Sequence, residues 1–333
     1  MSARTKISVA VITYNQQSTI RQTLDSILCQ KGDFDLEVVI GEDCSTDNTR
    51  AICEEYAKQS QIILLPSQKN LGIMTNFARV MKVCTGDYVG ICAGDDYWCD
   101  ERKLQKQLDY FHTHPEVGVV STAGYKLLVR SNQLVPNVVA PVHPISDGNI
   151  KPFYFSPNYR GGVYAMPLSL LIKRDLLQYV DFAEFVRRGF PVEDYPMQAI
   201  LAQHTRWGHI LDLCVVYRVY KESATFISFD HPNYLQYHQG LANIRRYLNE
   251  LFPADICFSE SQLQEQVFYK EYLLYLHRFE YINAKQLVAD APAIIADTAR
   301  YRQATRFTRT RLHFIVFHFY KECTNRKELN RKV

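Results

Sequence analysis

The chain has 333 residues, of which 47% are hydrophobic and 22% are charged. These are ordinary globular proportions, and they exclude a largely disordered or fibrous chain. The net charge of +3 hides a basic tail: ten Lys or Arg and two Glu follow residue 298, so the rest of the chain sums to 3 − 8 = −5. A nucleic-acid-binding protein would spread its basic residues over a folded face, so we expect no nucleic-acid partner.

Strand and helix patterns alternate over the first hundred residues. Nearly continuous apolar runs predict strands that are covered on both faces, at 7–12, 36–40, 62–65 and 87–92. Apolar residues at helical spacing predict helices at 17–30, around Ile52 and Tyr56, and at 74–84. This alternation is typical of a parallel sheet with right-handed crossovers, in which ligands bind beyond the carboxyl ends of the strands.

The chain continues less regularly after residue 100. The patterns predict a helix at 103–112, a strand at 117–121, an irregular stretch at 130–159, a strand at 165–172 and a helix from Arg174. From about Asn233 onward, Tyr, Leu and Phe recur at helical spacing. We therefore predict an α/β domain over 1–230 with a mostly parallel central sheet, and a helical C-terminal extension over 231–333.

Three polar clusters follow predicted strands, where a ligand would bind. They are Thr13-Tyr14-Asn15, the segment 41–49 with Asp43, and Gly94-Asp95-Asp96-Tyr97-Trp98. Carboxylates at one edge of a sheet repel each other unless a cation or hydrogen-bond donors lie between them. The adjacent pair Asp95-Asp96 offers the hard oxygen ligands that suit Mg²⁺ or Mn²⁺. Taken alone, the pair is better explained as a turn that caps the following helix.

In combination and in order, these segments resemble the family-2 inverting glycosyltransferases. The resemblance is carried by 7–15, 41–49, 94–98 and the Lys-Leu-Gln-Lys-Gln segment at 103–107, and it covers roughly residues 5–225. It implies a GT-A fold, with a nucleotide-binding half over 1–100 and an acceptor-binding half over 101–230. It also implies a nucleoside-diphosphate sugar as donor, with a UDP-sugar expected first, and Mn²⁺ or Mg²⁺ as cofactor.

The same resemblance implies roles for individual residues. Asp96 would bind the metal, with Asp95 beside it in contact with the metal and the nucleotide. Thr13 and Asp43 would contact the base, while Tyr14 and Asn15 would line its pocket. Asp47 is expected to order the loop, and Trp98 is either a wall of the sugar pocket or a core residue.

Val192-Glu193-Asp194-Tyr195 precedes a predicted helix with apolar Met197 and Leu201. Helix capping would explain an acidic residue there. The resemblance makes Asp194 the base that takes the acceptor's proton, with Glu193 as a second catalytic candidate. A positioned carboxylate improves a poor hydroxyl nucleophile by about 10²–10⁴ in rate, and capping and catalysis are compatible.

One departure from the family pattern lies at Tyr217-Arg218-Val219-Tyr220, which resembles the family's Tyr-Arg-x-His segment. Tyr220 stands where His is frequent. If that His helps to hold the metal or diphosphate, this chain would use Arg218 or Lys221 instead. A structural ion pair is an equally good explanation of Arg218.

The basic tail places arginines beside the apolar segment 312–320. This pattern predicts either contact of 300–320 with an anionic membrane surface or a helix that buries its Phe residues on the protein. No apolar run reaches the about 18–20 residues that cross a bilayer, and the N-terminus does not resemble a signal peptide. Nine scattered cysteines without a Cys-x-x-Cys pair favour reduced thiols. We therefore expect a cytoplasmic protein, peripheral on the inner face of the membrane if the tail binds there.

These observations lead to a hypothesis with two rivals. We expect a metal-dependent inverting glycosyltransferase acting on a glycan or lipid-linked acceptor in polysaccharide synthesis. One rival is a non-catalytic sugar-nucleotide-binding subunit of a polysaccharide assembly complex. The other is a sugar nucleotidyltransferase, which should carry a Gly-rich basic loop after the first strand, where this chain has Tyr14-Asn15-Gln16-Gln17.

Overall fold

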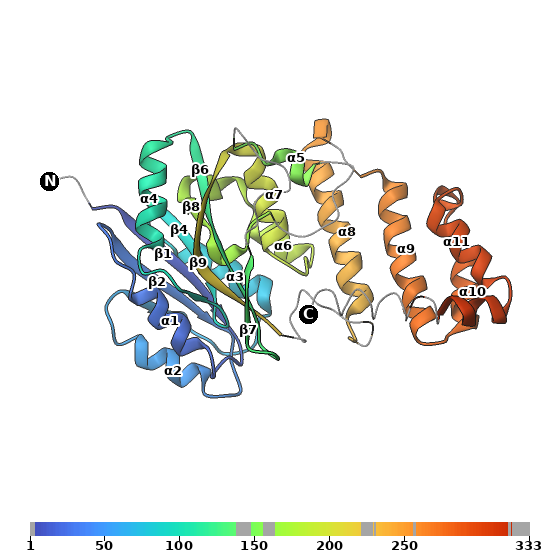
Figure 1. Ribbon diagram of the computed structural model, residues 1–333, viewed down its shortest axis with the longest axis horizontal. Coiled ribbons are helices and arrows are strands. Elements are labelled where there is room, and N and C mark those ends of the chain that lie inside the picture. Colours follow the sequence, from blue (N-terminus) through green and yellow to red (C-terminus); the bar gives the residue numbers. More distant parts are fainter. Residues whose placement is uncertain are drawn as a thin grey trace. The chain divides into compact units, whose positions relative to one another are not determined.

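The computed structural model describes residues 4–137, 148–155, 164–220, 229, 231–255, 258–318 and 321. The chain divides into two compact units, Met1–Tyr220 and Lys221–Val333. The sequence placed the division at residue 230. The first unit is α/β and the second is helical (Figure 1), so the predicted fold class is confirmed. Lys221 and much of the predicted irregular stretch lie outside the described residues.

The first half of the α/β unit is a parallel sheet in the order β3-β2-β1-β4. Its strands are β1 (Lys6–Thr13), β2 (Asp35–Glu42), β3 (Ile62–Leu64) and β4 (Tyr88–Ala93). They are joined through α1 (Ile20–Leu28), α2 (Thr49–Tyr56) and α3 (Ile73–Val83). The strands and helices predicted for this half are confirmed, with small differences at their ends. The register places Thr13 beside Glu42 and Ile12 beside Ala93, so the carboxyl ends meet at one edge.

Strand β1 is buried on both faces, as its continuous apolar sequence predicted. Ile7, Val9 and Val11 lie in a hydrophobic core with α1 and α4 (Lys103–Thr113). On the opposite face α3 packs against β1 and β2, and a Cβ at Gly41 would lie 2.4 Å from Val80 of that helix. Because helices cover both faces, the polar groups of this half gather at the edge where the strands end.

The sheet continues beyond β4 with short and irregular strands, in the order β8-β6-β9-β5, and β7 pairs with β6. They are β5 (Tyr97–Trp98), β6 (Val117–Leu128), β7 (Gln133–Asn137), β8 (Leu171–Lys173) and β9 (Arg206–Val219). Strands β5, β7 and β9 were not predicted from the sequence. Register shifts between β6 and β9 interrupt the regular alternation of apolar residues, which removes the period-2 signal.

The predicted strand at 165–172 is largely wrong. Only its last two residues belong to β8, and the preceding residues form the 3₁₀ turn η1 (Pro167–Ser169). The helix predicted from Arg174 is a second 3₁₀ segment, η2 (Arg174–Tyr179). Pro167 explains the first difference, because proline lacks the N–H that a central strand needs. Three α-helices complete the described part of this unit: α5 (Lys151–Tyr154), α6 (Phe182–Arg187) and α7 (Asp194–His204).

The second unit consists of helices around a core of its own. They are α8 (Tyr234–Leu251), α9 (Glu260–His277), α10 (Tyr281–Ala289) and α11 (Ala299–Thr308), with short 3₁₀ turns η3 (Pro253–Asp255) and η4 (Ala293–Ile295) and a further helical stretch at 311–318. Tyr272, Ala284, Phe314 and Phe317 are among the buried residues of this core. Among the described helices of the chain, none combines the length and apolarity that a membrane span requires.

Candidate active site

The Asp95-Asp96 pair lies in a tight turn directly after β4, at the edge where the parallel strands end. The Asp96 carboxylate is buried, and its Oδ1 accepts a hydrogen bond of 2.8 Å from the backbone N–H of Arg218. The turn is fixed from α1 by Thr23, whose hydroxyl donates to the carbonyls of Gly94 at 3.0 Å and Asp96 at 2.6 Å. The pair is therefore held by distant segments of the chain.

Arg218 locks this turn with its side chain as well as its backbone. The buried guanidinium donates to the carbonyl of Asp95 and to the side chain of Gln22, and it lies 4.8 Å from the ring centre of Tyr97. Arg218 was expected either to contact the diphosphate or to form a structural ion pair. These contacts favour a structural role, in which the guanidinium donates to carbonyl and amide oxygens and not to a carboxylate. Gln22 gave no sequence signal beyond being a polar residue on α1.

The electrostatics of the aspartate pair fit a divalent cation. Burial raises the pKa of Asp95, and burial together with the charge of Asp95 raises the pKa of Asp96 well above its ordinary value. Among the described residues, no group of three or more His, Cys, Asp or Glu could hold a metal. One or two carboxylates are nevertheless what Mg²⁺ or Mn²⁺ commonly takes from a protein when substrate phosphates supply the other ligands. A cation would relieve the repulsion between the two aspartates.

Thr13 and Gln16 pack against the same turn. The Thr13 hydroxyl donates to the Gln16 side-chain oxygen at 2.7 Å, and the Gln16 side chain is also hydrogen-bonded to Asp95. A Cβ on Gly94 would lie 2.5 Å from the Gln16 oxygen and 2.6 Å from the Thr13 hydroxyl. Any larger residue at this position would have to displace the side chains of Thr13 and Gln16. Gln16 was not predicted from the sequence, where its only signal is its place just after β1.

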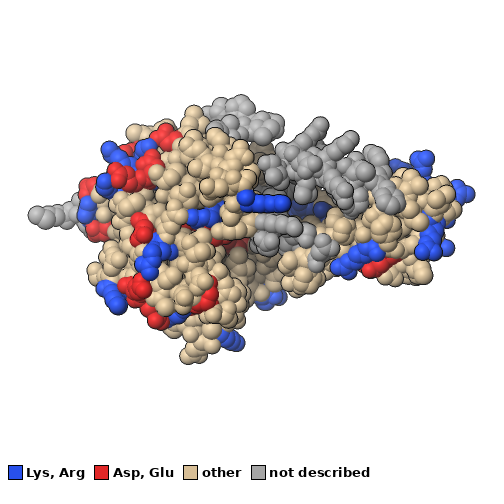
Figure 2. Space-filling model, turned by 60° about the horizontal axis from the view of Figure 1, so that its bottom comes forward, with Lys and Arg blue, Asp and Glu red and all other residues tan. Residues whose placement is uncertain are grey.

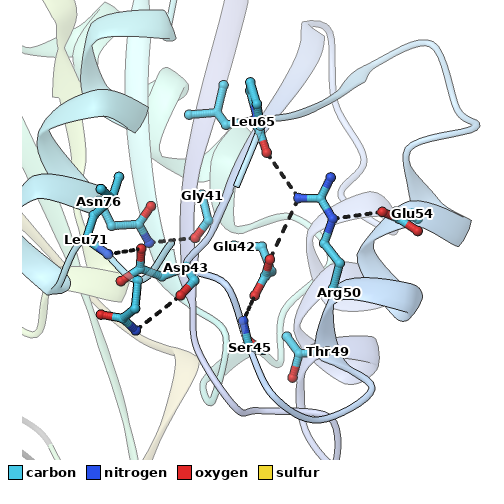
Figure 3. Close-up of polar contacts among 12 residues, drawn as sticks. Gly41, Glu42, Asp43, Ser45, Thr49, Arg50, Glu54, Leu65, Leu71 and Asn76 are labelled. Atoms are coloured by element: carbon cyan, nitrogen blue, oxygen red, sulfur yellow. Dashed lines mark hydrogen bonds and ion pairs between the residues drawn. The ribbon is translucent and has the colours of Figure 1, made fainter. Parts of the chain in front are cut away.

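Asp43 joins the end of β2 to the segment before α3 (Figure 3). Its buried carboxylate accepts hydrogen bonds from the backbone N–H groups of Leu71 at 2.8 Å and Gly72 at 2.9 Å. Its carbonyl accepts from the side chain of Asn70 at 3.1 Å. Gly72 has φ +80, a conformation that favours glycine. Asp43 thus fixes the path of a second loop at the binding edge.

A second acidic residue, the buried Glu42, holds the loop that follows β2. It was not predicted from the sequence. Glu42 is fully buried; one carboxylate oxygen accepts from the N–H of Ser45 at 2.5 Å, and the other lies 3.7 Å from the guanidinium of Arg50. Arg50 also binds the carboxylate of Glu54 at 2.8 Å and the carbonyl of Leu65 at 3.1 Å (Figure 3). The pair holds the 43–49 loop against α2.

Tyr14 and Asn15 lie at the rim of the same edge. Tyr14 is 44% exposed, so its ring is accessible to a ligand. Asn15 has φ +52, and its side-chain oxygen accepts from the N–H of Thr46 at 2.8 Å. Asp47 accepts from the N–H groups of Gln17 at 3.1 Å and Thr49 at 2.9 Å, so its expected loop-ordering role is confirmed.

Trp98 is a core residue in this structure, in agreement with the second of its two expected roles. Its indole N–H donates to the carbonyl of Leu168 at 3.0 Å, and its ring lies in the hydrophobic core. The amine of Lys103 lies 4.2 Å from the ring centre and donates to Gln107 at 2.9 Å. Lys103 is fully buried, and burial lowers its pKa to about 7. The Lys-Leu-Gln-Lys-Gln segment therefore supports the core behind the aspartate turn.

Glu193 and Asp194 form a separate carboxylate group at the start of α7. Asp194 Oδ1 accepts from the N–H of Tyr195 at 2.7 Å, while Glu193 makes no side-chain capping bond. Burial raises the pKa of Asp194 to about 6, and burial with the charge of Asp194 raises that of Glu193 to about 8. Capping thus describes Asp194 only in part, because a pure cap would have a lowered pKa. Asp95 and Asp96 contribute to neither shift.

The comparisons with known proteins concern the part of the chain that holds the aspartate turn. Residues 8–151 match the family model for Glycosyl transferase family 2. Over these residues the chain is similar to a family 2 glycosyltransferase domain. This part of the chain is 30% identical over 146 residues to the putative glycosyltransferase EpsE of Bacillus subtilis, covering 42% of this chain and 52% of that protein. It is 42% identical over 115 residues to the uncharacterized protein Rv1520 of Mycobacterium tuberculosis, covering 34% and 33%.

The chain therefore spans a third to a half of the length of these curated relatives. Among solved structures, S. aureus TarS 1-349 in complex with UDP-GlcNAc superimposes with a TM-score of 0.57 at 16% identity, covering 97% of this chain and 92% of that one. The mannosyltransferase PcManGT from Pyrobaculum calidifontis, in complex with GDP-Man and Mn²⁺, gives 0.54 at 19% identity, covering 96% and 88%. These similarities confirm the predicted GT-A-like α/β fold.

Proposed function

We propose that this protein is a metal-dependent inverting glycosyltransferase that transfers a sugar from a nucleoside-diphosphate sugar to a hydroxyl of a glycan or lipid-linked acceptor. The observation that carries the proposal is the buried Asp95-Asp96 turn at the carboxyl edge of a parallel sheet, within the residues that match the family 2 model. The similar structures bind UDP-GlcNAc or GDP-Man, and one of them binds Mn²⁺, which supports such a donor and such an ion. A UDP-sugar is the first donor to test.

Each group at the carboxyl edge has a task in this proposal. Asp96 and Asp95 would hold Mn²⁺ or Mg²⁺, and the ion would neutralise the charge that develops on the departing diphosphate. Thr13 and Asp43 would contact the base, and the exposed ring of Tyr14, beside Asn15, would cover it. Asp95 would also contact the nucleotide. Gln16, Gln22 and Arg218, through both its backbone and its side chain, keep the aspartate turn in position, and of the two expected diphosphate contacts, Arg218 and Lys221, only Lys221 stays a candidate.

Asp194 would take the proton from the acceptor hydroxyl as that oxygen attacks the anomeric carbon. A pKa of about 6 leaves most Asp194 carboxylates ionised at neutral pH while keeping them more basic than an exposed aspartate. Glu193, with a pKa of about 8, would remain mostly neutral beside it. Attack opposite the leaving group inverts the anomeric configuration in one displacement, so no covalent enzyme intermediate and no second carboxylate nucleophile are needed.

The division of the α/β unit into donor and acceptor halves and the contact with the membrane belong to the same proposal. The described α/β unit would bind donor and acceptor, with residues 1–100 serving the nucleotide and 101–230 the acceptor. Contact of 300–320 with the inner face of the cell membrane would bring the protein to a lipid-linked acceptor.

The test is a screen of the purified chain against UDP-, GDP- and dTDP-sugars by thermal shift, with and without Mn²⁺, followed by transfer and donor-hydrolysis assays with the donor that binds. We expect one donor to stabilise the protein only with Mn²⁺, and Asp96→Asn to abolish that dependence. Lys58→Gln, an exposed lysine on the same unit, serves as control. Metal-independent turnover would contradict the metal assignment. Donor binding without hydrolysis or transfer would support a non-catalytic subunit instead.

A further inference from the structure

The aromatic residues of the basic tail are already used inside the second unit. Phe314 and Phe317 are buried in its core, where Phe317 stacks on Phe307 with ring centres 3.9 Å apart. Phe314 contacts Tyr281 at 5.6 Å, and the His318 ring is hydrogen-bonded to the carbonyl of Leu276. Of the two explanations of this segment, burial on the protein is therefore correct for the two Phe residues. They are not available to a membrane surface.

A different set of side chains in the same segment faces outward. Arg302, Arg306 and Arg309 are exposed and follow one another at spacings of four and three residues, so they share one face of α11 and its C-terminal end. A bend at residues 309–310 separates α11 from the next helical stretch, on which Leu312 is 70% exposed and Val316 is 58% exposed, one turn apart. We call these five residues together with exposed Arg311 the basic–apolar face.

The arginines of this face have no acidic partner among the residues that the structure describes. Within the described residues, none of Arg302, Arg306, Arg309 and Arg311 forms an ion pair, whereas the neighbouring Arg300 lies 3.5 Å from Glu265. Residues 299–318 contain no Asp or Glu at all. On the face that the space-filling view shows, this unit carries several Lys and Arg side chains and a small acidic area beside some of them (Figure 2). Arginines that share a face without counter-charges repel one another, so an anionic partner would stabilise them.

We propose that the basic–apolar face binds the surface of an anionic phospholipid membrane. Phosphate headgroups match the guanidinium groups in charge and geometry. The apolar partner that Leu312 and Val316 require is supplied by the acyl boundary of a bilayer, but not by a soluble polyanion. This inference deepens the proposed function, because it names the surface on which a lipid-linked acceptor would be met. Only the biological role of membrane binding rests on the proposed function. Lipid binding and sugar transfer are measured separately.

The experiment is co-sedimentation of the full chain with vesicles of phosphatidylcholine alone and of phosphatidylcholine mixed with phosphatidylglycerol. We expect binding only to the anionic vesicles and a decrease with salt, because the Debye length shortens. Each arginine near an anionic surface contributes about fivefold to binding, so Arg302→Gln/Arg306→Gln/Arg309→Gln should weaken it about a hundredfold. The same three positions changed to Lys should retain most of the binding, because the charge is kept.

The matched control removes three exposed positive charges from the first unit, as Lys58→Gln/Lys82→Gln/Arg102→Gln, and should bind vesicles like the unaltered chain. Leu312→Gln should weaken binding about tenfold, since one leucine leaves the apolar boundary. Equal binding to neutral and anionic vesicles, or unaltered binding of the triple arginine variant, would overturn the proposal. The proposal would also be overturned if Leu312→Gln bound vesicles as well as the unaltered chain and a soluble polyphosphate displaced the vesicles completely. The face would then bind polyanions and not a membrane surface. Donor hydrolysis without vesicles reports separately on the transferase.

Discussion

The pH dependence of transfer tests the assignment of Asp194 as the base. Burial raises its pKa from 3.8 to about 6. Because only the ionised carboxylate accepts a proton, kcat/KM should fall about tenfold for each pH unit below 6, and about a tenth of the molecules would be competent at pH 5. An exposed aspartate would place this limb near pH 4. The position of the acidic limb therefore measures the burial that the structure gives to Asp194.

The neighbouring Glu193 supplies a matched control. Its pKa of about 8 leaves it mostly neutral at pH 7, so Glu193→Gln replaces an uncharged acid by an uncharged amide of similar shape. This variant should keep more than a tenth of the activity and an acidic limb near pH 6. Asp194→Asn removes the proton acceptor and should lower kcat by about 10²–10⁴ while donor binding, followed by thermal shift, stays within about twofold.

Stability gives an independent check that Asp194→Asn is folded. A raised carboxyl pKa means that the folded state holds its proton more tightly, so this group stabilises the fold at low pH and loses that contribution as the pH rises from about 4 through 6. The shift of Asp194 corresponds to at most about 3 kcal/mol. Urea unfolding should therefore find Asp194→Asn at least as stable as the unaltered chain at pH 8. An acidic limb near pH 4, full transfer by Asp194→Asn, or equal losses in both variants would refute the reasoning.

Three further changes test how the site is supported. Gly94→Ala should cost about 1–3 kcal/mol in urea unfolding and weaken Mn²⁺-dependent donor binding, because its Cβ would overlap Thr13; wild-type affinity would contradict this close approach. Burial opposes ionisation of Glu37, but hydrogen bonds led by that from Lys6 lower its pKa to about 2. Glu37→Gln should therefore lower the free energy of unfolding by about 2 kcal/mol at pH 7. The difference from the unaltered chain should vanish as the pH falls from about 4.5 to 2. The buried amine of Lys103, with a pKa of about 7, should make the free energy of unfolding rise between pH 7 and 10. Lys103→Met should remove this rise. If the free energy of unfolding of the variant rose equally with pH, Lys103 would not be the cause.

The sequence predicted the first half of the fold well because its signals are local and strong. The central residues of β1, β2 and β4 are buried on both faces and are therefore mostly apolar, and the helices between the strands show clear helical spacing. Strand β9 could not be predicted in this way. Its first half carries exposed Leu211 and Asp212, and its pairing with β6 shifts register, so neither alternation nor a continuous apolar run remains.

The charged residues of the candidate site were predictable from the sequence, but the residues that hold them in position were not. Asp95 and Asp96 were located because they follow a strand end in a motif. Gln22, Thr23 and the backbone N–H of Arg218 reach the same turn from α1 and β9. That convergence is a tertiary property, and single residues of these types are common on any helix or strand. The same limit applies to Trp98, whose aromatic ring fits a pocket wall or a core equally well until its neighbours are known.

The segment 164–170 connects the two carboxylate groups that the proposed reaction needs. Its carbonyl at Leu168 accepts the indole N–H of Trp98, which follows the aspartate turn by two residues. Its Ala165 exchanges hydrogen bonds of 2.9 and 3.2 Å with the side chain of Gln198, one helical turn after Asp194. The carboxylates do not influence each other's ionisation, yet each is tied to this one short segment. In the proposed reaction this segment would fix the spacing of the two carboxylate groups, so its substitution should alter turnover more than donor binding.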